Sequence, residues 1–269
     1  MNFTPFQLSL LCRLAYFDPP GTLGQSIGSD LTVGRLVYAL LRTAIPTAGE
    51  REALYKITAD NMLSGLRIID YQNADDTTGF VAYAFGAADA SVVLAFRGSE
   101  MLPERLRGLI DWIDNLRAPF AGSIQYPDVE QFAAPYAHGA LMLTGHSKGG
   151  HNALYGLGTS PNRRARATVF DAQGFACRQL NPTAVRAIGL RGINYVQARD
   201  PVGALLCHPE RRIFVQVVGT GHPHALDAMQ FDEAGQPVQS TQRIGFALIG
   251  WLSCWFVSIH NKQNHAQPA

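Results

Sequence analysis

One pentapeptide restricts the fold more than any other feature of this 269-residue chain: Gly-His-Ser-Lys-Gly at 145–149, directly after an apolar run at 141–144. A Gly-x-Ser-x-Gly sequence between a strand and a helix is typical of a nucleophile elbow, a sharp turn that projects the serine hydroxyl from the end of a sheet. Because glycine has no Cβ, the two outer glycines allow the helix to pack close to the strand. The pattern therefore predicts a strand, a tight turn at Ser147 and a helix.

Strand and helix patterns alternate along the rest of the chain. Strands are expected at 66–71, 80–85, 91–96, 141–144, 167–170, 193–197 and 213–218, and helices at 6–17, 31–41, 50–62, 111–116, 129–136, 151–157 and 182–188. This alternation predicts an α/β protein with a mostly parallel central sheet and helices on both faces, in which the first two strands form a hairpin. We expect a single domain over 1–269, with an N-terminal helical region (1–65), a core that holds the chemistry (66–232) and an apolar C-terminal helix (244–259).

The composition and charge restrict the partners and the cellular location. The formal net charge is +1, so the chain has no overall field that would attract nucleic acid, and we expect no nucleic-acid partner. The four cysteines are scattered without a Cys-x-x-Cys pair, which favours synthesis in the reducing cytoplasm. Arg13 interrupts the apolar run near the N-terminus, so we expect no signal peptide. Export by a leaderless route and association with a membrane both stay open.

Three residues are candidates for nucleophilic catalysis. A serine hydroxyl needs a general base to accept its proton, and the base needs an acid that fixes its tautomer. In a parallel sheet such groups gather beyond the carboxyl ends of the strands. Asp200 follows the strand expected at 193–197, and His224 follows the last expected strand. The order Ser147, Asp200, His224 is that of the α/β-hydrolases.

The acid and the base each have an alternative. Asp171 follows the fifth expected strand and is the alternative acid, whereas His222 is the alternative base. We favour His224 because the next residues, Ala-Leu-Asp, could begin a helix that holds its ring. No metal or cofactor is expected, because the spacing of His222 and His224 with Cys207 or His208 matches no standard zinc pattern.

Acyl transfer also needs N–H donors that face the developing oxyanion. One donor is expected at the backbone of Lys148, the residue after the nucleophile, and the second in an earlier loop at a strand end. Phe-Arg-Gly-Ser at 96–99 leaves a buried strand at this point, so the N–H of Ser99 is the expected second donor and its hydroxyl could add another. The alternative interpretation of this segment is a plain Gly-Ser turn.

Three blocks together resemble the signature of the class 3 lipases: VVLAFRGS at 92–99, DWIDNL at 111–116 and TGHSKGG at 144–150. Lys148 stands where those lipases usually carry leucine, and in this the chain is more similar to their bacterial relatives, the Mbeg1-like proteins. The HALD block at 224–227 is also similar to the histidine-bearing block of that group.

The resemblance covers about 66–232 and implies an α/β-hydrolase fold and hydrolysis of carboxylic esters, often those of acylglycerols or phospholipids. The resemblance also implies that Ser147, Asp200 and His224 form the triad and that Ser99 and Lys148 are the oxyanion donors. The segment between Leu116 and Leu141 is short for a class 3 lipase, which indicates a reduced lid or helix layer. Some antibacterial lipase effectors without signal peptides have a similar architecture, a similarity at the level of the class that leaves an inhibitor or immunity protein open as a partner.

The apolar segment 244–259 carries no charged residue and includes Trp251, Trp255 and Phe256. At about sixteen residues it is shorter than the roughly 20 that a bilayer span needs. A buried final helix, a helix at a membrane surface and a span all stay open. We expect a lipase or phospholipase A that works through an acyl-enzyme, with a soluble short-chain esterase or thioesterase as one alternative and a non-catalytic binding protein as another.

Overall fold

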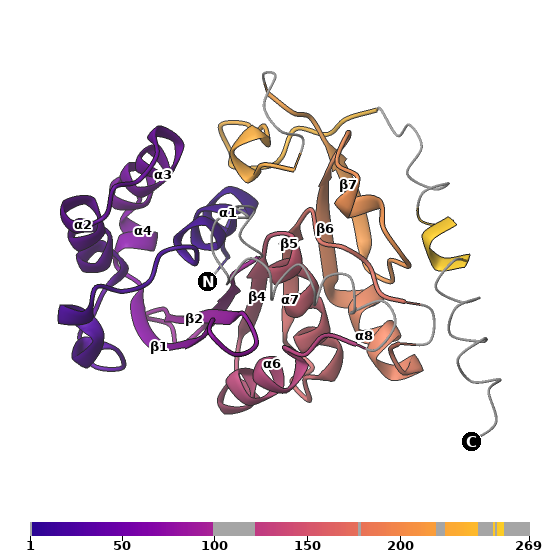
Figure 1. The fold of residues 1–269 in the computed structure, drawn as a ribbon, viewed down its shortest axis with the longest axis horizontal. Helices are drawn as coiled ribbons and strands as arrows, with labels where there is room; N and C mark the ends of the chain where they lie inside the picture. Colours follow the sequence, from indigo (N-terminus) through magenta and orange to yellow (C-terminus); the bar gives the residue numbers. More distant parts are fainter. Residues whose placement is uncertain are drawn as a thin grey trace.

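A computed structural model of the protein describes residues 2–98, 122–176, 179–218, 224–241, 250 and 252–255. In this part of the chain seven strands form one sheet in sequence order, from β1 to β7 (Figure 1). The strands are β1 Arg67–Ala74, β2 Phe80–Gly86, β3 Val92–Phe96, β4 Leu141–Gly145, β5 Arg166–Phe170, β6 Gly192–Gln197 and β7 Arg211–Val215. The first three strands pair antiparallel and β3 to β7 pair parallel, so the expected hairpin and the mostly parallel sheet are confirmed.

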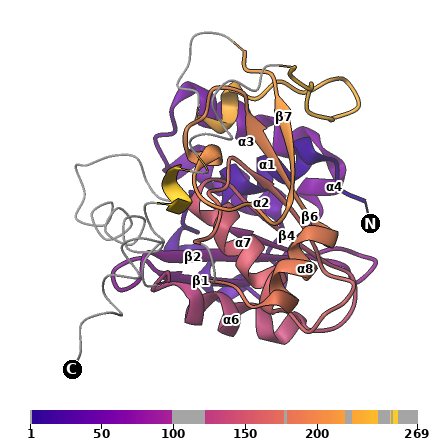
Figure 2. The same ribbon diagram turned by 90° about the vertical axis from the view of Figure 1, so that its right-hand side faces the viewer.

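Helices cover both faces of the sheet, as the alternating sequence pattern predicts (Figure 2). Residues of α1 to α4 pack on one face, and residues of α6 to α8 pack on the other. The helices are α1 Pro5–Leu14, α2 Val33–Thr43, α3 Ala48–Ala59, α4 Asn61–Ser64, α6 Tyr126–Ala133, α7 Lys148–Thr159 and α8 Pro182–Arg191.

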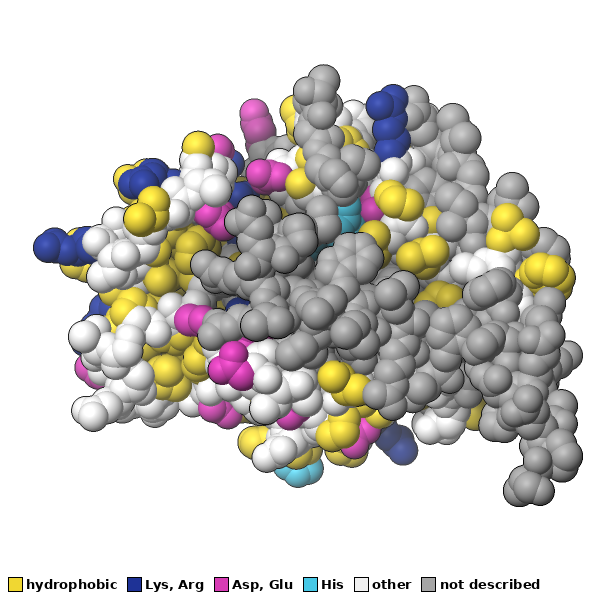
Figure 3. Space-filling view, viewed as in Figure 1, with side chains coloured by type: hydrophobic (Ala, Val, Ile, Leu, Met, Phe, Trp, Pro, Cys, Tyr) yellow, Lys and Arg dark blue, Asp and Glu magenta, His cyan; other side chains and the backbone are white. Residues whose placement is uncertain are grey.

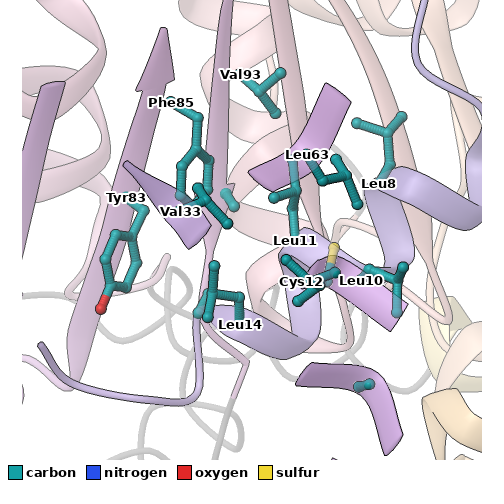
Figure 4. Close-up of a cluster of buried hydrophobic side chains, with 14 of the residues drawn as sticks. Leu8, Leu10, Leu11, Cys12, Leu14, Val33, Leu63, Tyr83, Phe85 and Val93 are labelled. Carbon is teal, nitrogen blue, oxygen red and sulfur yellow. The ribbon is translucent and has the colours of Figure 1, made fainter. Parts of the chain in front are cut away.

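The strand β2 shows how the sequence builds both cores. Successive side chains of a strand point to opposite faces of its sheet. Accordingly, Phe80 and Ala82 belong to the cluster with α6 and α7, whereas Tyr83 and Phe85 belong to the cluster with α1 (Figure 4). Because β2 is buried on both faces, its sequence is a continuous apolar run rather than an alternating one.

Helix α1 places the N-terminal region directly against the strand that leads to Ser147. Thr4 and Gln7 form a reciprocal capping box at its start. On its buried side the Cys12 Sγ atom lies 3.1 Å from the Thr144 Oγ1 atom in β4. Burial raises the pKa of the Cys12 thiol to about 12, so this thiol stays neutral and packs as an apolar group.

Some expected elements end earlier than the sequence predicts, among them the helix expected at 6–17, which ends at Leu14. The helix expected at 50–62 breaks at Asp60, whose side chain accepts hydrogen bonds from the N–H groups of Met62 and Leu63 and so begins α4. The strand expected at 213–218 leaves the ladder after Val215, because its neighbour β6 already ends at Gln197. The following residues bond instead to 228–239, where the Gln216 N–H donates to the Val238 carbonyl.

The helix expected at 111–116 and most of the segment 244–259 lie outside the described residues. Within 252–255, Ser253 Oγ accepts a hydrogen bond of 2.9 Å from the Leu206 N–H, and Cys254 packs with Leu206 and Ala176. Leu252 and Trp255 are 45% and 54% exposed. Among the described residues, none of the helices has the length and hydrophobicity that crossing a bilayer requires.

The described surface mixes side chains of all kinds. Figure 3 shows apolar, basic and acidic groups interspersed on one face of the molecule. This mixture agrees with the net charge of +1 and with the absence of a single-sign patch on the described part of that face.

Candidate active site

Ser147 occupies the turn between β4 and α7 in a strained backbone conformation. Its φ is 57° and its ψ is −125°, a left-handed region that a non-glycine residue rarely adopts. Such strain costs about 1–3 kcal/mol and persists only where the surroundings enforce it. The Ser147 N–H donates to the Phe170 carbonyl at 2.9 Å, and the Ser147 carbonyl accepts from the His151 N–H at 3.1 Å. The neighbouring strand and the first turn of α7 therefore hold the serine in place, half-buried at the sheet end.

The two outer glycines of the pentapeptide permit a very close approach of helix to strand. A Cβ on Gly145 would collide with the backbone of Gly149, and a Cβ on Gly149 would collide with the backbone of Phe96. Since backbone atoms cannot move aside as a side chain can, neither position accepts a larger residue without displacing α7 or β3. The steric role predicted for these glycines is confirmed.

The structure brings Asp200 and His224 together. The His224 Nδ1 atom lies 3.0 Å from the Asp200 Oδ1 atom, and the two side chains are 5% and 0% exposed. The carboxylate of Asp200 also accepts hydrogen bonds from the N–H groups of Val202 and Gly203, at 3.0 and 2.9 Å. Those two bonds fix the acid in the turn that follows β6, so it presents one oxygen to the ring.

His146 connects the serine turn to the loop that carries His224. Its Nε2 atom lies 2.9 Å from the His224 carbonyl oxygen, and its Nδ1 atom lies 3.2 Å from the Tyr16 hydroxyl. A carbonyl oxygen can only accept, so Nε2 carries the proton and Nδ1 accepts from the tyrosine. Burial and the neighbouring His224 lower the pKa of His146 to about 3, which keeps the ring neutral. His146 is therefore suited to holding the loop rather than to exchanging protons.

Asp171, the alternative acid, lies in the same cluster. Its side chain is fully buried, and its carboxyl oxygens accept from the Gln197 backbone N–H at 2.7 Å and the Gln197 Nε2 at 2.8 Å. The carboxyl groups of Asp171 and Asp200 are in hydrogen-bonding contact, and burial together with the charge of Asp200 holds the pKa of Asp171 well above its usual range. The Gln197 Nε2 also donates to the Ala225 carbonyl at 2.9 Å, one residue after His224.

Sequence reasoning did not find Gln197, His146 or Tyr16 as parts of this cluster. His146 stands at a variable position of the Gly-x-Ser-x-Gly pattern, and its residue type was the one available signal. Gln197 and Tyr16 carry no local signal, because their roles depend on partners far away in the sequence.

One group of described residues has the composition of a metal site. Side-chain ligand atoms of His146, Asp171 and His224 lie within 4.8 Å of one another. However, both ring nitrogens of His146 and both oxygens of Asp171 already have hydrogen-bond partners within the protein. We therefore assign no metal to this cluster. Of the zinc ligands considered from the sequence, His208 contacts Glu210 at 2.6 Å, and His222 lies outside the described residues.

The expected oxyanion donors are described in part. Lys148 is the first residue of α7, and its side chain is buried. Ser99 lies outside the described residues. The strand that precedes it nevertheless ends beside the serine, because a Cβ placed on Gly98 would lie 3.4 Å from the Ser147 Cβ. Arg97 fastens this strand end through ion pairs with Asp75 and, at 3.6 Å, with Asp18.

The sheet, the strained serine between β4 and α7, and the acid and histidine that follow later strands form the arrangement of an α/β-hydrolase. Several solved structures are similar to the chain. One is a mono- and diacylglycerol lipase from Aspergillus oryzae. Its sequence identity is 12%, the alignment covers 91% of this chain and 90% of that chain, and the TM-score is 0.49. A mutant form of MDLA from Penicillium cyclopium has 14% identity, coverage of 91% and 88%, and a TM-score of 0.48. A Rhizomucor miehei lipase propeptide complex has 14% identity, coverage of 94% and 76%, and a TM-score of 0.46.

No curated protein matches the sequence. A family model does match, over residues 59–245, and its description is Mbeg1-like. This range contains the serine turn, Asp200 and the HALD block that carry the resemblance described above. The chain belongs to the Mbeg1-like family.

Proposed function

We propose that this protein is a serine hydrolase that cleaves carboxylic esters of lipids, as a lipase or phospholipase A. The observation that carries the proposal is the 3.0 Å contact between His224 Nδ1 and Asp200 Oδ1 at the sheet end where the strained Ser147 lies. Because Nδ1 faces the acid, Nε2 is the ring nitrogen that we propose as the base. Membership of the Mbeg1-like family and the strained serine between a parallel strand and a helix support ester hydrolysis.

In the proposed reaction, His224 Nε2 takes the proton of Ser147 Oγ while the oxygen attacks the ester carbonyl. Asp200 stabilises the imidazolium that forms, and His224 then gives the proton to the leaving alcohol. A water molecule, deprotonated in the same way, hydrolyses the acyl-enzyme and frees Ser147. The backbone N–H groups of Lys148 and Ser99 are the proposed oxyanion donors, and loss of one such donor typically lowers the rate by about 10²–10³-fold.

The exposed side chains near the C-terminus favour a lipid substrate. Leu252 and Trp255 are three residues apart, which places them on the same side of a helical turn. Both are about half exposed, whereas Ser253 and Cys254 between them contact the loop at Leu206. Tryptophan is favoured at the boundary of water and lipid. We propose that this segment contacts a lipid surface and that an inhibitor or immunity protein, where one exists, covers the serine.

The test compares the wild-type protein with Ser147→Ala on a short p-nitrophenyl ester and on phospholipid vesicles, with product identification by mass spectrometry. Ser29→Ala, at an exposed serine, is the matched control. We expect hydrolysis by the wild type and the control and a loss of several orders of magnitude in Ser147→Ala. A fluorophosphonate probe should label the wild type at Ser147. Equal rates for wild type and Ser147→Ala would refute the proposal, and a folded protein without labelling would favour the non-catalytic alternative.

The contact of Ser253 with Leu206 favours a second candidate, a soluble short-chain esterase or thioesterase in which the C-terminal segment is structural. Trp255→Ser separates the two candidates. If the substrate is a lipid, this variant should lose vesicle hydrolysis and keep its rate on the soluble ester. If the substrate is a small soluble ester, both rates should stay close to those of the wild type.

A further inference from the structure

Two buried carboxyl groups stand beside the ring of His224. Asp200 Oδ1 is 3.0 Å from the His224 Nδ1 atom, and a carboxyl oxygen of Asp171 lies within 4.8 Å of a ring nitrogen of the same histidine. The side chains of both acids are fully buried, and their carboxyl groups are in contact. Two ionised carboxylates in such contact repel strongly in a buried site, so one of the pair retains a proton.

The surroundings of the two acids decide which one is ionised. Asp200 receives two backbone N–H groups from the turn 202–203 and also faces the histidine ring. Asp171 receives its two N–H groups from Gln197, a neutral residue. The titratable groups around Asp171 are Asp200, His224 and His146, and of these His146 is held neutral. The negative charge is therefore better stabilised on Asp200, and the proton resides on Asp171.

We propose that Asp171 is a positioning residue whose neutral carboxylic acid donates a hydrogen bond to the Asp200 carboxylate, so that one negative charge faces His224. The inference rests on the proposed ester hydrolysis and adds a residue to it. A protonated carboxyl keeps its capacity to accept, so the two bonds from Gln197 are compatible with this state. Through the Gln197 Nε2 bond to the Ala225 carbonyl, the same acid also holds the loop of His224.

A single charge at this position has a chemical consequence. If both acids were ionised, the imidazolium form of His224 would be stabilised in the resting protein, and the ring could not accept the proton of Ser147 at neutral pH. With Asp171 neutral, the ring faces one carboxylate, which orients it and stabilises its charge during the reaction. Asp171 directly follows β5 and has a left-handed φ of 47°.

Two substitutions at this position separate the hydrogen bond from the charge. Asparagine and glycine both tolerate a φ of 47° well, so Asp171→Asn and Asp171→Gly avoid backbone strain. Asparagine keeps a neutral N–H donor toward Asp200 and gives up one of the two oxygens that accept from Gln197, whereas glycine removes the side chain. We expect kcat of Asp171→Asn within about threefold of wild type, and kcat of Asp171→Gly lower by about 10–100-fold with KM little changed. Asp200→Asn should lose about 10⁴-fold, and Asp232→Asn, at an exposed carboxyl, should change nothing.

The pH dependence of kcat/KM is a further measurement. It would stay unchanged in Asp171 variants if the role of Asp171 were only structural. The acidic limb, which reports protonation of His224, should stay in place in Asp171→Asn. In Asp171→Gly it should move to higher pH, because an Asp200 carboxylate without its donor stabilises the imidazolium more. If Asp171→Asn is as inactive as Asp200→Asn, Asp171 acts as an ionised acid and the proposal is wrong. The proposal is also wrong if Asp171→Gly has the wild-type rate and profile.

Carboxyl ¹³C chemical shifts measured against pH test the proton directly and require no activity. At pH 7 the Asp171 resonance, assigned by its loss in Asp171→Asn, should be that of a carboxylic acid, and the Asp200 resonance that of a carboxylate. Two carboxylates at pH 7, or the reverse assignment, would overturn the inference. The two proposals fail separately: a wild-type protein without Ser147-dependent hydrolysis refutes the function, whereas the titration decides the state of Asp171 in either case.

Discussion

The hydroxyl of Tyr16 lies 3.2 Å from the Nδ1 atom of His146, the residue directly before Ser147. This contact brings the N-terminal helical region, which precedes the sheet in sequence, to the centre of the candidate site. It also fixes the proton of His146 on Nε2, where it bonds to the backbone of His224. The serine turn and the histidine loop are thus linked by a chain of hydrogen bonds that begins just after α1.

Tyr16→Phe should weaken this link without removing the aromatic packing. We expect a loss of about 0.5–1.5 kcal/mol in the free energy of unfolding, the typical net value of one hydrogen bond. The rate of ester hydrolysis should fall because the His146 ring is held less firmly. Denaturant unfolding and kcat measure the two effects. Tyr55→Phe, at an exposed tyrosine, is the control, and an equal effect of both substitutions would show that the contact with His146 contributes nothing.

His146 should make the stability of the protein depend on pH below neutrality. Its pKa is lowered from 6.5 to about 3 in the folded state, so between these values the unfolded chain binds a proton that the folded chain does not. The free energy of unfolding should therefore decrease as the pH falls from about 6.5 toward 3, by up to a few kcal/mol. His146→Gln should flatten this part of the curve. His138→Gln, at an exposed histidine, should leave it unchanged.

Asp171 should act on stability in the opposite direction. Its raised pKa means that the folded protein keeps a proton that the unfolded chain releases above about 3.9. Stability from this group is full at low pH and is lost as the pH rises. The denaturant midpoint of Asp171→Asn, relative to that of the wild type, should thus be higher at pH 8 than at pH 4. A difference of the same size at both pH values would contradict the prediction.

The glycines of the serine turn should be among the least replaceable residues of the chain. An alanine Cβ at Gly149 would overlap the backbone of Phe96, and overpacking of this kind against backbone costs typically 1–3 kcal/mol or more. Gly149→Ala should therefore lower the unfolding midpoint strongly or prevent folding. A Cβ at Gly24 would have no neighbour within 4 Å, so Gly24→Ala is the matched control and should be close to neutral.

The sequence predicts the sheet well because its strands are either continuous apolar runs or end at turn residues. The serine turn is predicted for a steric reason, since Gly145 and Gly149 are the residues that permit it. The break at Asp60 is not predicted, because an aspartate fits the polar side of a helix as well as a cap. Likewise the end of β7 depends on where β6 ends, and no local pattern around Val215 contains that information.

The sequence predicts those residues of the candidate site whose side chains have a recognisable chemistry of their own. Asp200 and His224 follow strand ends in an order that indicates their partnership, and they meet at 3.0 Å. Asp171 is identified as an alternative to Asp200, whereas the structure places the two acids side by side. A choice between them could not be made from sequence, because the surroundings of Asp171 include Gln197, which carries no sequence signal of its own.

The order of the strands in the sheet equals their order in the chain. During synthesis each new strand can therefore dock beside the one made before it, without waiting for a distant segment to insert between them. The proposed nucleophile follows the fourth strand, the proposed acid follows the sixth and the proposed base follows the seventh. A nascent chain on the ribosome thus lacks a complete set of reacting groups until most of it has been translated.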